Sequence, residues 1–78
     1  MAATAVVANV TVVGASATAS HLTIWPSGQP KPVASDLNFT GGQTVANLAI
    51  VKVGADGALN IANNSGTVHV IVDVLGWY

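Results

Sequence analysis

The chain has 78 residues and a formal net charge of −1, and 51% of its residues are hydrophobic while only 6% are charged. Because soluble domains carry about 25% charged residues, uncharged Thr, Ser, Asn, Gln and Gly must provide most of the polar surface. The near-neutral charge argues against nucleic acid as a partner, and the absence of cysteine excludes stabilisation by disulfides.

The first predicted strand covers residues 5–13, where Val6, Ala8, Val10 and Val12 share one face that we expect to point inward. This N-terminal stretch is apolar but lacks the basic region of a signal peptide, so any export signal is expected to lie outside the sequence. No apolar run approaches the roughly 18 residues of a membrane helix. Membrane insertion is therefore not expected.

Five further strands are predicted from runs of Val, Ile and Thr that alternate in polarity between turn residues. The second strand ends at Pro26, where a proline-rich loop begins, because proline cannot donate to a strand ladder. Later turns are indicated by Gly41-Gly42 and by the segments 54–57 and 63–66, which are rich in Gly, Asn and Asp. The predicted strands are 21–25, 34–39, 44–53, 58–62 and 67–75.

Residues 1–78 are thus predicted to form one all-β module, either a small antiparallel β-sandwich of about six strands or a partly closed barrel. A domain of this size buries only about 60% of the surface that its unfolded chain exposes, and small domains usually compensate with disulfides, metals or association. We expect a homodimer or homotrimer to complete the fold. The aliphatic residues expected at the contact are Val68, Val70, Val72, Val74, Leu48 and Ile50.

Six segments carry a recognisable pattern in fixed order and spacing: residues 5–11, 22–26, 35–39, 42–48, 53–57 and 72–78. Together they resemble a repeat module of secreted and cell-surface actinobacterial proteins. This resemblance implies an extracellular β-sandwich with no established catalytic role, often attached to secreted hydrolases or repeated in surface proteins. The family unit usually opens with a segment carrying an Arg-Leu-Leu-Asp-Thr-Arg type motif, which has no counterpart here, so exposed edges that invite pairing are expected.

Catalysis and metal binding are both disfavoured by the spacing of the polar residues. His69 and Asp73 share a strand face but lie roughly 13 Å apart along it, and the chain has no nucleophile-elbow motif. The possible ligands His21, His69, Asp36, Asp56 and Asp73 show no zinc spacing or calcium-loop pattern. We therefore expect no catalytic residue, metal or cofactor, and we interpret Asp73 as a structural carboxylate.

The large aromatic residues are candidates for sugar binding, because exposed rings stack on the carbon-hydrogen faces of pyranoses. Trp25, Trp77 and Tyr78 are the candidate glycan-binding residues, and Trp25 is favoured because Pro26 and the following loop place it at a strand end. Against this interpretation, a small core needs large side chains, so Phe39 and one Trp are expected there.

The leading hypothesis is a non-catalytic extracellular interaction module that associates with itself and binds polysaccharide or the cell envelope. The alternative is a purely structural spacer or assembly unit without a small ligand. Both hypotheses rest on the same argument. The chain has few charged residues, and it is too short to bury all of its aliphatic side chains without a partner.

Overall fold

A computed structural model describes residues 4–78, which form six strands and no helix. The all-β class and the predicted number of strands are confirmed. In chain order the strands are β1 (Ala5–Val13), β2 (Ala19–Pro26), β3 (Leu37–Thr40), β4 (Val45–Lys52), β5 (Leu59–Asn63) and β6 (His69–Trp77).

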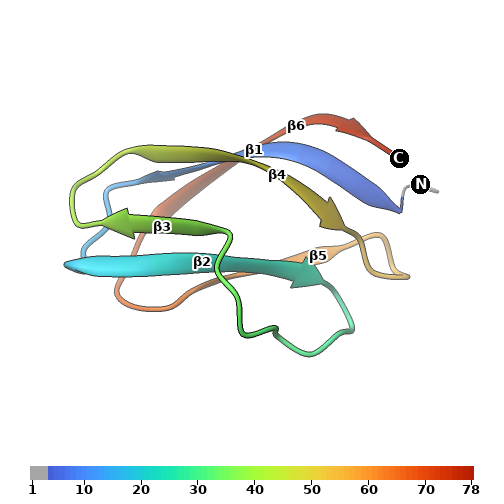
Figure 1. The fold of residues 1–78 in the computed structure, drawn as a ribbon, viewed down its shortest axis with the longest axis horizontal. Helices are drawn as coiled ribbons and strands as arrows, with labels where there is room; N and C mark the ends of the chain where they lie inside the picture. The colour runs from blue at the N-terminus through green and yellow to red at the C-terminus, as the bar shows by residue number, and fades with distance from the viewer. Residues whose placement is uncertain (1–3) are drawn as a thin grey trace.

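The strands form two antiparallel three-stranded sheets, with strand orders β4-β1-β6 and β3-β2-β5. Figure 1 shows them as an upper and a lower layer, with the start of β1 beside the end of β6. The Thr4 amide there donates to the Tyr78 carbonyl over 2.7 Å. The described sheets are not closed into a barrel, so the sandwich, and not the barrel alternative, is the observed architecture.

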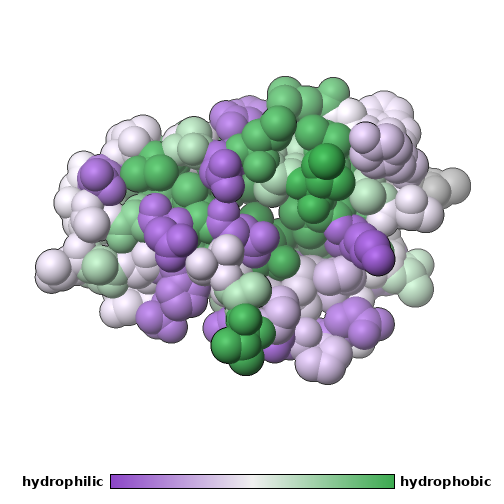
Figure 2. Space-filling model, viewed as in Figure 1, coloured by the Kyte–Doolittle hydropathy of each residue, from purple (hydrophilic) through white to green (hydrophobic). Residues whose placement is uncertain are grey.

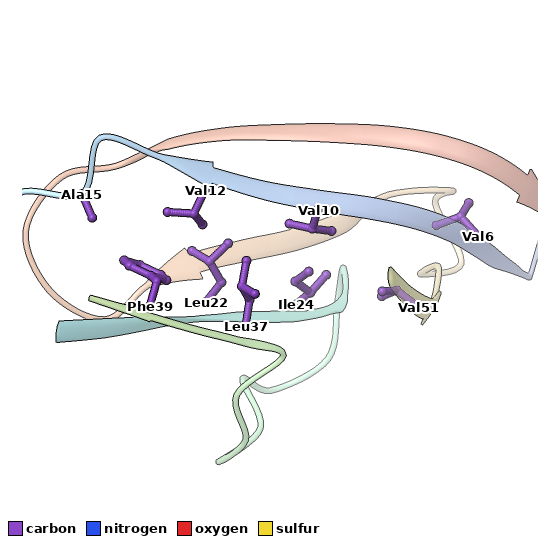
Figure 3. Packing of buried hydrophobic residues seen from close by; sticks show 9 residues of the cluster. All are labelled: Val6, Val10, Val12, Ala15, Leu22, Ile24, Leu37, Phe39 and Val51. Atoms are coloured by element: carbon purple, nitrogen blue, oxygen red, sulfur yellow. The ribbon is translucent and has the colours of Figure 1, made fainter. Parts of the chain in front are cut away.

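The core lies between the sheets, and β1 supplies much of it. Its residues alternate between buried and half-buried along the whole strand, which confirms the inward face predicted from Val6 to Val12. Figure 3 shows Val10 and Val12 pointing toward Leu22 and Ile24 of β2. The other buried members of this cluster are Val6, Ala15, Leu37, Phe39 and Val51.

The loop between β2 and β3 folds back over the outer face of the second sheet. The Asp36 carboxylate accepts a hydrogen bond from the Ile24 amide (2.8 Å), and the Thr23 hydroxyl donates to the Ala34 carbonyl (2.7 Å). The Asp36 amide also donates to the Leu22 carbonyl. Since residues 34–36 bond to β2 in this way, β3 begins at Leu37 and not at residue 34 as predicted.

Asp56 organises the turn between β4 and β5. Its carboxylate accepts hydrogen bonds from the Ser27 hydroxyl (2.9 Å) and the Ala58 amide (3.1 Å). These two bonds favour the charged form and hold the pKa of Asp56 below its ordinary value. The stabilisation is present above the ordinary pKa and is lost as the pH falls through the lowered one.

The last strand begins two residues later than predicted, at His69. Thr67 pairs with the loop after β1 instead, because its amide and its hydroxyl both donate to the Ser16 hydroxyl, while the Ser16 amide donates to the Thr67 carbonyl. Gly66 precedes this contact with a φ of 69°, a backbone conformation that glycine adopts without steric cost.

Candidate interaction surfaces

The two sheets are offset, and β6 lies where the first sheet is not fully covered. β4 packs over β2 and β3, whereas β6 is at the opposite edge of the same sheet. Val10 on the central strand is only 2% exposed, but its register partner Val72 on β6 is 40% exposed. Register partners in an antiparallel pair share a face, so the inner face of the sheet becomes accessible to solvent at β6.

Val74 continues this partly uncovered inner face toward the end of β6. It pairs with the buried Ala8 yet is 56% exposed. On the second sheet, Ile61 of β5 is also exposed although its register partner Ile24 is buried. The inner faces of both sheets therefore remain partly uncovered along β5 and β6.

A β-bulge changes the direction of the residues at the end of β6. The register shifts between Val7 and Ala8, so that Leu75 has no partner on β1 and Trp77 lies opposite Val6. Val6 is buried, and Trp77 consequently belongs to the inner face, beyond Val74. Without the extra residue, strict alternation would place Trp77 on the outer face.

The outer face of the first sheet carries a second apolar surface. Leu48 and Ile50 of β4 and Ile71 of β6 are each at least half exposed. Their register partners are Asn9, Val7 and Thr11, which alternate with the buried residues of β1. Figure 2 shows hydrophobic surface gathered where β6, β1 and the end of β4 lie in Figure 1.

The six residues predicted for self-association thus divide between two faces of one sheet. Val68 and Val70 are half-buried and pack against the core. Val72 and Val74 continue their stripe into the uncovered inner face. Leu48 and Ile50 lie on the opposite, outer face, so one flat contact cannot cover all six.

The three candidate glycan-binding residues do not share a face. Trp25 lies at the end of β2, half-buried, with its indole N–H donating to the Gln29 carbonyl over 3.0 Å. Trp77 belongs to the other sheet, and Tyr78 follows it with an exposed side chain. Phe39 is in the core as expected, but the expectation of a core tryptophan is wrong, since Trp25 packs beside its own loop and Trp77 is exposed.

The polar candidates are also spread over the molecule. Asp73 is exposed on the outer face of β6, opposite Asn9, and His69 lies opposite Val13. Within residues 4–78, no group of three or more His, Asp or Glu side chains is placed to hold a metal ion. No helix in this part of the chain is long and apolar enough to cross a membrane.

Asp36 has a structural role that the sequence interpretation missed. Besides binding the Ile24 amide, it accepts a hydrogen bond through its backbone carbonyl from the Asn47 side chain of β4 (2.9 Å). It therefore links the loop to both sheets. Its position between a proline-rich loop and a strand is a weak signal, because Asp is common at such turns for several local reasons.

No protein-family model matches this chain, and neither the curated proteins nor the solved structures include one with significant similarity to it. The arrangement of strands and the uncovered aliphatic surfaces are therefore the observations from which a function is proposed.

Proposed function

We propose that this chain is a non-catalytic extracellular interaction module that associates with further copies of itself. The observation that carries the proposal is the exposure of Val72 and Val74 on a face whose central strand is buried. The location is proposed from the resemblance to modules of secreted actinobacterial proteins and from a polar surface with few charges.

The energetic argument compares the uncovered side chains with the cost of association. Full burial of a Val, Leu or Ile side chain stabilises by about 1.5–3 kcal/mol. Removing several half-exposed side chains from water on each of two copies therefore offsets an association cost of about 4–15 kcal/mol. The scarcity of charged residues, two basic and three acidic, leaves little repulsion between copies.

Light scattering on single-lysine variants tests this proposal and identifies the face that is used. The wild-type protein is expected to have a mass of two or three times 7.8 kDa at micromolar concentration. If the inner face of β6 is the contact, Val74→Lys shifts the protein to monomer; if the outer face is the contact, Ile50→Lys does so. In either case a charge must be buried without a partner.

Val33→Lys is the matched control, because Val33 is fully exposed in the loop between β2 and β3. This variant should associate like the wild type. Circular dichroism checks that each variant keeps its strands. A wild-type protein that stays monomeric at every concentration tested would overturn the proposal.

Polysaccharide binding is a second candidate function, favoured by the exposure of Trp77 and Tyr78 at the end of β6. A ring that stacks on a sugar loses burial worth about 1.5–3 kcal/mol when it is removed. Trp77→Ala is therefore expected to weaken retention on cell-wall polysaccharide at least tenfold, as measured in pull-down assays. Val33→Ala, in the exposed loop between β2 and β3, serves as the control. If the wild type binds no polysaccharide, the purely structural module becomes the preferred proposal.

A further inference from the structure

The free edge of β6 is the longest unpaired strand edge among residues 4–78. β6 has nine residues and pairs only with β1, while the edge strands β3 and β5 have four and five residues. β4 has eight residues but ends at Lys52, and lysine at an edge discourages pairing. A free edge presents unpaired N–H and C=O groups that another strand can bind.

The side chains along this edge are arranged symmetrically about Ile71. On the outer face, His69 and Asp73 lie two residues before and two residues after it. When two identical strands pair antiparallel about a two-fold axis at Ile71, His69 of each copy lies opposite Asp73 of the other. An imidazole N–H can donate to a carboxylate in either protonation state, so the dimer gains two such pairs.

The inner face is equally self-complementary in this register. Val70 lies opposite Val72 of the second copy, and Val68, which immediately precedes β6, comes opposite Val74 where the pairing runs on. Val68 and Val70 already pack against their own core, so each exposed valine gains a half-buried valine as its neighbour. Aliphatic pairs in directly opposed positions stabilise antiparallel strands.

Neighbouring registers lose these pairings. An axis at Asp73 places two like-charged carboxylates in opposition, which is destabilising. With the axis at Val72, each polar residue faces an apolar one: Asp73 lies opposite Ile71, and His69 lies opposite Leu75. With the axis at Val70, His69 again faces the apolar Ile71. Only the axis at Ile71 pairs both polar residues with each other.

We propose that two copies of this chain join through their β6 edges, antiparallel and with the two-fold axis at Ile71. The first sheets of the copies then form one continuous six-stranded sheet of order β4-β1-β6-β6-β1-β4. This inference rests on the proposed self-association and specifies its strand, direction and register.

The test uses two variants that cannot pair with themselves but can pair with each other. In His69→Asp, the introduced carboxylate faces Asp73 of the second copy; in Asp73→Lys, the introduced ammonium faces His69. Each variant alone is expected to dimerise about tenfold more weakly than the wild type. Mixing the two variants places the introduced carboxylate opposite the introduced ammonium at one position and restores the His69–Asp73 pair at the other, so heterodimers should form with near wild-type affinity in sedimentation and native mass spectrometry.

Lys52→Asp, a charge change on the outer face at the β4 edge, is the control and should dimerise like the wild type. A monomeric wild type would remove the proposed self-association together with this register. A wild type that associates, with variants that associate equally well and mix at random, would overturn the β6 register while self-association stands.

Crosslinking gives a second measurement that does not depend on charge. The chain has no cysteine, and side chains directly opposed across an antiparallel pair have Cβ atoms about 4.5–5.5 Å apart, close to disulfide range. Ile71→Cys should therefore form a covalent dimer under mild oxidation, whereas Ile50→Cys should not. Equal crosslinking of the two variants, or none for Ile71→Cys in an associating protein, would contradict the register.

Discussion

Leu22→Ala is expected to lower the free energy of unfolding by about 2–5 kcal/mol. Leu22 is 0% exposed and lies on the central strand of the second sheet, facing the valines of β1. A chain of this length has a total stability of about 4–12 kcal/mol at the usual 0.05–0.15 kcal/mol per residue. One core truncation therefore removes a large part of it, and urea unfolding followed by circular dichroism measures the loss.

Leu48→Ala makes the same chemical change at a residue that is 58% exposed. It should change the free energy of unfolding by less than about 0.5 kcal/mol, provided that the protein is diluted below the concentration at which copies associate. Losses of equal size in the two variants would show that the core does not lie where β1 and β2 face each other.

Asp36→Ala is expected to cost about 2–3 kcal/mol, because it removes a carboxylate that accepts a hydrogen bond from the Ile24 amide at 2.8 Å. Hydrogen bonds to charged groups contribute about 1.5–3 kcal/mol, and a part-buried donor without a partner adds its own penalty. Since Asp36 also fixes the loop to β2 and β4, we expect the whole segment 26–36 to exchange its amide hydrogens faster in this variant.

Two variants separate the hydrogen bond from the charge. Asp36→Asn keeps a side-chain oxygen that can accept from Ile24, so it should be destabilised less than Asp36→Ala. Asp73→Ala also removes one carboxylate, but from an exposed site, and should have little effect on the monomer. If Asp73→Ala destabilised the monomer as much as Asp36→Ala, net charge and not the Ile24 bond would be the cause.

Strand bounds were predicted most accurately where one face of the strand is covered along its whole length. β1 is covered on one face from Val6 to Val12. Every second residue is therefore buried, as the two-residue period predicts, and the bounds of the strand agree with the prediction. β3 was predicted to begin too early, because no glycine or proline separates residues 34–36 from Leu37, although these residues bond to β2 as a loop. The competing contact is tertiary and leaves no periodic signal in the sequence.

The exposed surfaces were less predictable than the fold. Val68 to Val74 form one aliphatic stripe in the sequence, yet burial decreases along it, from the half-buried Val68 and Val70 to Val72 and Val74, which are 40% and 56% exposed. The offset between sheets depends on packing across the whole domain, not on local pattern. The position of Trp77 depends on the bulge at Leu75, which strict alternation cannot reveal.

Sedimentation equilibrium of the wild-type protein over a range of micromolar concentrations tests most directly whether another copy covers the exposed aliphatic surface. The expected result is a mass that rises with concentration from 7.8 kDa toward that of a dimer. A single species with the mass of one chain at all concentrations would contradict the account, since Val72 and Val74 would then be stable in water without a partner.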